Sequence, residues 1–175
     1  LDCDTQGLVD VHNPSAVALQ YANSETGVVQ SIPKDVGFCD MTQAFGKLPI
    51  AFNWTGAQMA AVSAHKMGGP KGVGALVVKR GTDIQAQIKG GGQEMGRRSG
   101  TENLVGIAGF GAAAASAAKD LESGAWEEVE ILRNFLENTI TEVDPGTTII
   151  GRQLSRLPNT SCLVTPGWKG ETQVM

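Results

Sequence analysis

The stretch "SAHKMGGPKGVGAL", from Ser63 to Leu76, sets a serine, a histidine, two lysines and four glycines between two apolar segments. The flanking letters, "MAAVS" and "ALVV", are typical of buried strands. Because glycine has no side chain, a flat ligand can lie directly against this backbone. A lysine that is shielded from water at such a place can act as an amine nucleophile. The stretch therefore predicts an α/β sheet with a ligand site where a strand ends.

The composition limits the class of protein. A chain of 175 residues with 41% hydrophobic residues fits one domain with a hydrophobic core. The net charge is −4 and the isoelectric point is near 5.2, with no basic block, so no nucleic-acid partner is expected. The longest apolar helical segment, residues 105–118, is rich in alanine and glycine and ends in charges. We therefore expect no membrane partner.

The three cysteines, Cys3, Cys39 and Cys162, are odd in number and widely spaced, with no Cys-x-x-Cys pair. This pattern supports neither a metal site nor a disulfide framework. The first ten residues have no basic region followed by an apolar one, so nothing marks the chain for secretion. A reducing, cytoplasmic location is the simplest expectation.

Short apolar segments alternate with loops in the first half, and helical patterns dominate the second half. Strands are predicted within "VALQYAN", "VGFCDM", "MAAVSAH" and "GVGALVVKR". A helix is predicted from Thr101 as its N-cap, and an amphipathic helix over residues 126–143. The apolar face of the second helix is expected to consist of Val129, Leu132, Leu136 and Ile140. Further strands are predicted in "TTIIG" and, broken by prolines, in "RLPNTSCLVTPG".

One connection conflicts with a simple parallel sheet. Only residues 31–36 separate a strand that ends near Gln30 from the strand that enters Asp40. A parallel crossover normally needs a dozen residues or more. Either these two strands are not parallel neighbours, or a segment is shortened here.

Polar residues collect where the apolar segments stop, and they suggest one small-molecule site. Their residue types match the needs of pyridoxal phosphate, which takes a lysine at its aldehyde, a carboxylate at its pyridine nitrogen, and donors for its phosphate and phenolic oxygen. The candidates are Ser24, Asp40, Gln43, Ser63, His65 and Lys66.

Ordinary structural roles remain open for each of these residues. A lysine after a strand is usually solvated, and an acid that ends a strand often caps a turn. His65 alone is compatible with a structural role, and "GGGQEMGRRSG" with a mobile loop. The spacing does not choose between Lys66 and Lys71 as the reactive lysine.

Five blocks, in order, resemble the cysteine desulfurases, which are pyridoxal-phosphate enzymes of the class V aminotransferase group with the fold type I architecture. The blocks are "ANSETGVVQ", "CDMTQAFGKLPI", "VSAHKMGGPKGVGAL", "GGGQEMGRRSGTEN" and "LPNTSCLVTPGWKGETQVM". The resemblance implies a mostly parallel sheet flanked by helices. It also implies an incomplete fold, with a partial large cofactor domain over residues 1–118 and the start of a smaller C-terminal α+β domain over 119–175.

The resemblance also implies a role for each site residue. Lys66 would form the internal aldimine and later move the α-proton of the substrate. Asp40 would pair with the pyridine nitrogen, and Gln43 would bond the phenolic oxygen. Ser63 and His65 would hold the phosphate. Thr101 would reach the phosphate bound by a neighbouring subunit, which implies a homodimer.

The chain also departs from the family pattern. Ser24 stands where the family usually has asparagine, with a shorter reach to the cofactor ring. Helical segments before Tyr21 and between Gln30 and Asp40 look shortened. The family's N-terminal region has no counterpart before Leu1, and its nucleophilic cysteine and a substrate-binding arginine lie beyond the equivalent of Met175.

The expected reaction takes sulfur from L-cysteine, leaves L-alanine, and passes the sulfur to an acceptor or scaffold protein for iron–sulfur cluster or other sulfur-cofactor assembly. Because the cysteine loop is missing, we expect these 175 residues alone to be inactive. Cys3, Cys39 and Cys162 are each poor candidates for a replacement sulfur carrier, since free cysteine is usually buried packing. A selenocysteine lyase, a cysteine sulfinate lyase, and a non-catalytic cofactor-binding or dimerisation module remain alternatives.

Overall fold

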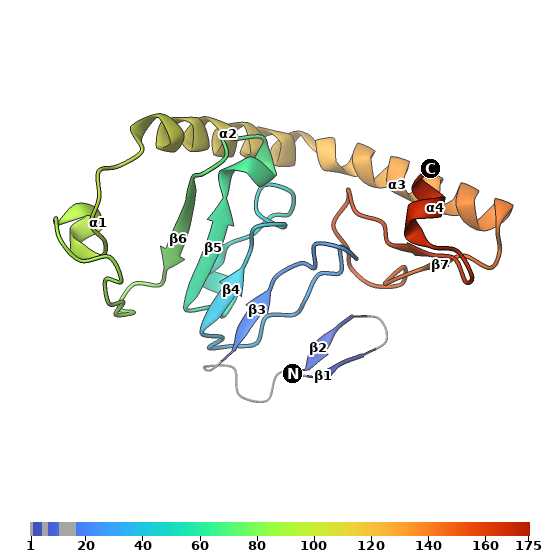
Figure 1. The fold of residues 1–175 in the computed structure, drawn as a ribbon, viewed down its shortest axis with the longest axis horizontal. Coiled ribbons are helices and arrows are strands. Elements are labelled where there is room, and N and C mark those ends of the chain that lie inside the picture. The colour runs from blue at the N-terminus through green and yellow to red at the C-terminus, as the bar shows by residue number, and fades with distance from the viewer. Residues whose placement is uncertain (1, 5–6, 11–16) are drawn as a thin grey trace.

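A four-stranded sheet forms the centre of the molecule (Figure 1). The computed structural model describes residues 2–4, 7–10 and 17–175 of the chain. The strand order is β3-β4-β5-β6, in which β3, β4 and β5 are parallel and β6 is antiparallel to β5. The strands are β3 Ala18–Gln20, β4 Phe38–Asp40, β5 Met59–Ser63 and β6 Gly74–Val78. The four strands lie within the four predicted segments.

The connection from β3 to β4 resolves the conflict over the crossover. The strand that pairs with β4 ends at Gln20, not near Gln30, so residues 21–37 are available for the crossover. The connection contains no helix and instead turns back on itself, with an antiparallel bridge between Ala22 and Val29. The segment near Gln30 is therefore not the parallel neighbour of β4; it belongs to the connection, and β3 is the strand that pairs with β4.

Two long helices, α2 Leu104–Ser123 and α3 Ala125–Val143, lie end to end along one side of the molecule (Figure 1). Gly124 joins them in the left-handed conformation, with φ of 75°, which glycine adopts without steric cost. The prediction that Thr101 caps the first helix is wrong. Asn103 is the N-cap, and its Oδ1 accepts the main-chain N–H of Gly106 at 3.1 Å.

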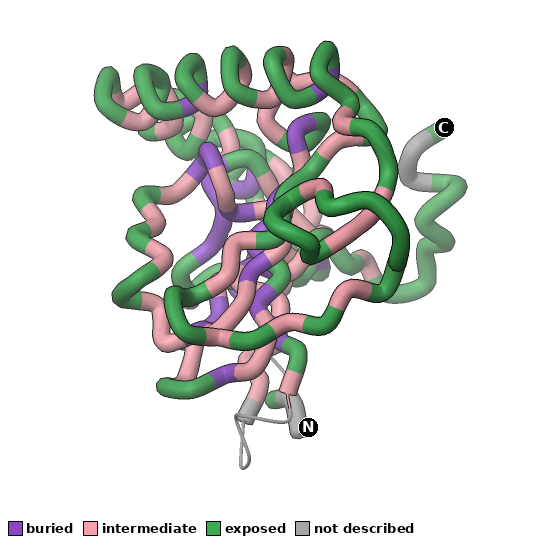
Figure 2. The backbone as a smooth tube through the Cα atoms, turned by 90° about the vertical axis from the view of Figure 1, so that its left-hand side faces the viewer, coloured by how far each residue is buried: buried purple, intermediate pink, exposed green. Residues whose placement is uncertain are grey.

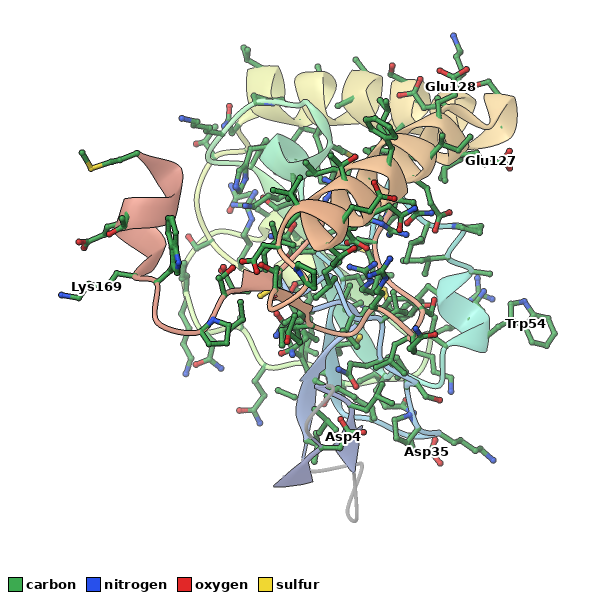
Figure 3. The ribbon with its side chains drawn as sticks, turned by 90° about the vertical axis from the view of Figure 1, so that its right-hand side faces the viewer. Asp4, Asp35, Trp54, Glu127, Glu128 and Lys169 are labelled. Atoms are coloured by element: carbon green, nitrogen blue, oxygen red, sulfur yellow. The ribbon has the colours of Figure 1, made fainter. Side chains whose placement is uncertain are left out.

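Short elements complete the fold, and each has few residues. They are β1 Asp2–Cys3, β2 Val9–Asp10, η2 Phe52–Trp54, η3 Ala64–Met67, α1 Gln93–Gly96, β7 Thr148–Ile149, β8 Leu163–Val164 and α4 Gly170–Val174. The β7–β8 pair is antiparallel and lies on the α3 side of the molecule. Figure 3 shows Trp54, in η2, projecting away from the body of the molecule.

The core lies between the sheet and its connections, where Figure 2 shows the buried segments. One buried cluster contains Cys39, Met41, Ala57, Ala60 and Val62. A second cluster, Ala22, Ala44 and Leu157, joins the sheet to the C-terminal part of the chain. Figure 2 also shows that the two long helices are mostly exposed.

The orientation of α3 differs from the expectation. Of the four residues expected to face the core, Leu132 is 66% exposed and Leu136 is 50% exposed. The side of α3 that faces the protein is more polar: Glu137 is buried, and the Trp126 indole donates to the carbonyl oxygen of Gly46 at 2.9 Å. The helix is therefore held to the protein by specific polar contacts, and its apolar residues Ile131, Leu132, Phe135 and Leu136 are exposed.

Helix α2 is long and apolar enough to cross a membrane by length and composition alone. A core helix of a soluble protein passes the same test. In the structure, small residues of α2 pack closely on the segment after β5. An added Cβ at Gly109 would lie 3.0 Å from Pro70, and one at Gly69 would lie 3.0 Å from Ala113. This close approach accounts for the small residues at Gly109 and Ala113 of α2.

The predicted boundary between residues 118 and 119 falls inside α2, which continues to Ser123. The division into a large and a small domain stays a prediction.

Candidate functional site

A cavity of about 300 Å³ lies at the end of β4. Three of the predicted site residues, Ser24, Asp40 and Gln43, line it, and the remaining lining residues are Gln20, Ala22, Asn23 and Thr42. These residues come from the ends of β3 and β4 and from the turns that follow them. The structure thus brings these three side chains to one cavity, and their roles at a cofactor stay predictions.

Asp40 is the last residue of β4, and its side chain is exposed. Its Oδ1 accepts the main-chain N–H of Thr42 at 2.9 Å, which is the turn-capping role considered from the sequence. A carboxylate has further acceptor capacity beyond this one bond. This bond to Thr42 therefore holds Asp40 beside the cavity and leaves its carboxylate able to accept further hydrogen bonds.

Asn23 stabilises the turn that contains Ser24. The Oδ1 of Asn23 accepts the main-chain N–H groups of Glu25 and Thr26, at 2.9 and 3.0 Å. The Ser24 hydroxyl is exposed and lies 3.5 Å from Oε1 of Glu25. Ser24 thus stands at the cavity with a short side chain on a rigid turn.

Ser63 ends β5, the strand next to β4, and His65 and Lys66 follow it. Parallel pairing sets Asp40 beside Ala61, so β5 runs two residues further than β4 and ends at Ser63. The Ser63 hydroxyl and Nδ1 of His65 are hydrogen-bonded at 2.8 Å. His65 and Lys66 lie in η3, are exposed, and are not among the lining residues of the 300 Å³ cavity. The structure places them at the neighbouring strand end.

The choice between Lys66 and Lys71 stays a prediction. Both lysines are exposed, and Lys66 lies in η3, directly after the end of β5. Burial lowers the pKa of Lys47, and the positive charge of Lys66 lowers it further. The glycine that ends η3, Gly68, has φ of 85°, and its N–H bonds the carbonyl oxygen of Ala64. This closes the turn that carries Lys66.

Thr101 is not part of the cavity in this chain. It lies in the segment between α1 and α2, on the β6 side of the sheet, whereas β3 forms the opposite edge (Figure 1). Two non-glycine residues in α1, Glu94 and Met95, have positive φ values of 49° and 57°. The predicted role of Thr101 at the site of a neighbouring subunit stays a prediction.

Sequence reasoning missed Lys47, which is only 7% exposed. Its Nζ donates to the main-chain oxygen of Gln43 at 2.8 Å and lies 3.4 Å from Oε1 of the same residue. The signal was available as a lysine four residues after Gln43, inside the apolar segment "AFGKLPI". It was missed because lysine is seldom buried.

The residues present fit pyridoxal phosphate by their donor chemistry. A carboxylate stands at the rim of the cavity, an amide lines the cavity wall, and a hydroxyl–imidazole pair and a lysine follow the adjacent strand. Gly68 leaves the backbone bare beside that lysine, since an added Cβ there would meet nothing within 4 Å. Each group that the cofactor requires therefore has a counterpart at these two strand ends.

Comparison with known families decides the class. A family model described as aminotransferase class-V matches residues 3–173. The chain belongs to the class V aminotransferase family. Members of this family, including the cysteine desulfurases, depend on pyridoxal phosphate. The family match confirms the resemblance drawn from the five sequence blocks.

Curated relatives and solved structures agree with this class. A cysteine desulfurase from Sinorhizobium fredii is 40% identical over 98% of this chain and 46% of its own length. One from Cereibacter sphaeroides is 41% identical over 91% of this chain and 42% of its own length. The chain thus spans less than half the length of these relatives.

A NifS-like protein from Rickettsia africae has a TM-score of 0.86 at 34% identity, covering 97% of this chain and 52% of that protein. A second NifS-like protein has a TM-score of 0.84 at 33% identity, covering 97% and 51%. These neighbours confirm an α/β fold of the pyridoxal-phosphate fold type I, of which this chain matches about half of each neighbour.

Proposed function

We propose that this chain forms the cofactor-binding part of a cysteine desulfurase, which takes sulfur from L-cysteine and leaves L-alanine. The main support is the side-by-side ending of β4 and β5, which presents Asp40 and Gln43 next to the turn that carries Lys66. The names of the curated relatives give the substrate class.

In this proposal each side chain has its own role. The Asp40 carboxylate would accept from the pyridine nitrogen, and the Gln43 amide would donate to the phenolic oxygen. Ser63 and His65 would hold the phosphate. Pyridoxal phosphate, when bound, supplies an electron-withdrawing ring that stabilises negative charge at the α-carbon of an amino acid. Lys66 would hold the cofactor through Nζ and would move the proton at that α-carbon.

The partners are part of the same proposal. Sulfur would pass to an acceptor or scaffold protein, for iron–sulfur cluster or other sulfur-cofactor assembly, in the cytoplasm. A homodimer would bring Thr101 of one subunit to the cofactor phosphate of the other. The exposed position of Thr101 supports this arrangement, because the side chain is accessible to a second copy.

Covalent labelling tests the proposal at the level of one residue. The chain would be incubated with pyridoxal phosphate, reduced with borohydride to fix the cofactor to the amine that holds it, and digested for peptide mass mapping. We expect the added mass on the peptide that contains Lys66, and its loss in Lys66→Ala but not in the matched variant Lys71→Ala. A label spread evenly over surface lysines would contradict the proposed site.

Turnover is a separate measurement. With L-cysteine as substrate, we expect no sustained alanine and sulfide production from these 175 residues, because Cys39 is buried and Cys162 is half-buried. Sustained production would show that one of the three cysteines serves as the sulfur carrier.

A further inference from the structure

The turn after β4 places Gln43 and Lys47 on the same side. Main-chain bonds run from Phe45 N–H to the carbonyl oxygen of Met41 at 2.8 Å and from Leu48 N–H to that of Ala44 at 3.0 Å. These are bonds over four residues, as in an α-helix. Side chains four residues apart on such a turn are neighbours.

The contact between Lys47 and Gln43 fixes which end of the Gln43 amide faces the lysine. A lysine ammonium has three donors and no acceptor, so only the oxygen of the Gln43 amide can face it favourably. Nζ of Lys47 lies 3.4 Å from this Oε1, and its stronger bond, 2.8 Å, goes to the main-chain oxygen of Gln43. The amide NH2 of Gln43 is therefore directed away from Lys47.

Gln43 is half-buried and lines the 300 Å³ candidate cofactor cavity together with Asp40 and Ser24. A donor is the group needed for a phenolic oxygen that carries negative charge, whereas an amide flipped by 180° would offer an acceptor and repel it. The orientation of this amide thus decides whether Gln43 helps or hinders cofactor binding.

The burial of Lys47 disfavours its charged form and therefore costs free energy. Lys47 is 7% exposed, burial lowers its pKa, and the positive charge of Lys66 lowers it further. A lysine whose only task was to close a surface turn would gain from remaining solvated. Its burial beside Gln43 suggests a task at the site.

We propose that Lys47 is a positioning residue, which orients the Gln43 amide so that its NH2 donates into the cofactor cavity. The inference rests on the proposed function, since it assigns Gln43 to the cofactor's phenolic oxygen. Lys47 itself need not touch the cofactor.

A double-mutant cycle on pyridoxal-phosphate affinity tests the inference. The apparent dissociation constant would be measured by titration of the visible absorption band for the wild-type chain, Lys47→Met, Gln43→Leu and the double variant. We expect Lys47→Met to weaken binding about tenfold, which corresponds to about one hydrogen bond. In the Gln43→Leu background, the same change should have less than about a twofold effect, because the group it orients is absent.

Controls separate orientation from folding. Lys119→Met, an exposed lysine on α2, should leave the affinity unchanged, and Lys47→Arg should restore most of it. Gln43→Glu keeps an acceptor for Lys47 but removes the NH2, so it should lose cofactor affinity without losing thermal stability. This variant tests the role given to the Gln43 amide, and Lys47→Arg tests the inference if Lys47→Met folds poorly.

The outcomes are distinguishable. If the wild-type chain shows no cofactor band, both the proposed function and this inference fail. If the wild type binds cofactor but Lys47→Met binds it equally well, or if the effects of Lys47→Met and Gln43→Leu multiply, only the inference is overturned.

Discussion

The carboxylate of Glu137 and the guanidinium of Arg156 form a two-point ion pair, at 2.7 and 2.8 Å, and each side chain is only 2% exposed. Ser161 adds a third hydrogen bond to Oε1 of Glu137. The pair joins α3 to the segment that precedes β8. Because a buried charge without its partner is costly, this contact determines how firmly α3 is attached.

Removing one member of this pair should destabilise the protein strongly. We expect Glu137→Ala to lower the free energy of unfolding by about 3–5 kcal/mol, since Arg156 would remain buried and charged. Urea denaturation followed by circular dichroism measures the effect. The matched control is Glu130→Ala, which removes the half-exposed partner of Arg133 and should cost less than about 1 kcal/mol. If the pair acts as described, replacing both Glu137 and Arg156 by methionine costs less than Glu137→Ala alone.

The same carboxylate should make stability depend on acid pH. Burial raises the pKa of Glu137, but the bonds from Arg156 and Ser161 and the charges of Arg156 and Arg133 outweigh it, and the net pKa lies below the ordinary 4.5. The stabilisation is therefore complete above the ordinary value and is lost as pH falls from 4.5 through the lower folded-state pKa. Unfolding curves between neutral pH and about pH 3 should show the wild-type advantage over Glu137→Gln shrinking in this range. A constant advantage over the whole range would contradict the assignment.

Cys39 should be protected from thiol reagents in the folded protein. Burial, and then the charge of Asp40, raises the pKa of its thiol to about 12, so the reactive thiolate is scarce at neutral pH. In a variant with Cys3→Ser and Cys162→Ser, iodoacetamide should modify Cys39 only after urea is added. Mass spectrometry of the intact protein measures this, and rapid modification of the native variant would show that the strand is accessible.

The close packing of α2 on the lysine-bearing segment should be sensitive to added volume. A Cβ at Gly69 would lie 3.0 Å from Cβ of Ala113 and 3.0 Å from the carbonyl oxygen of Ala64. We expect Gly69→Val to lower the free energy of unfolding by about 1–3 kcal/mol through overpacking. Gly111→Ala, on the same helix and facing open space, should instead raise it by up to about 1 kcal/mol. Equal effects of the two changes in thermal denaturation would argue against a close contact.

The sheet could be predicted because its strands are continuous apolar segments that end in polar residues. Gln20, Asp40 and Ser63 each end a strand, and the parallel pairing of β3, β4 and β5 then brings the polar residues to one edge. The prediction of a strand near Gln30 was wrong, because Val28 and Val29 form isolated bridges and do not join the central sheet. A short apolar segment alone does not reveal whether it will join the central sheet.

The attachment of α3 could not be predicted from its own pattern. Its apolar residues satisfy a helical period, which implies a face toward the core. The helix is nevertheless oriented by Glu137 and Trp126, whose partners lie 19 and 80 residues away in the chain. Such pairs are visible only when the chain is folded. Lys47 escaped notice for a related reason, because nothing local marks a lysine as buried.

The loop between β5 and β6 is closed at both ends. Ser63 pairs with Gly74, Ala64 N–H bonds the carbonyl oxygen of Val73 at 3.1 Å, and Gly69 N–H bonds that of Ala64 at 2.9 Å. The Ser63–His65 pair and Lys66 therefore lie in one short segment that main-chain hydrogen bonds hold at both ends. An insertion or deletion between Ser63 and Lys66 would shift the proposed phosphate-binding pair and the proposed reactive amine together. The position of the Ser63–His65 pair and the position of the Lys66 amine therefore cannot be changed independently by such a mutation.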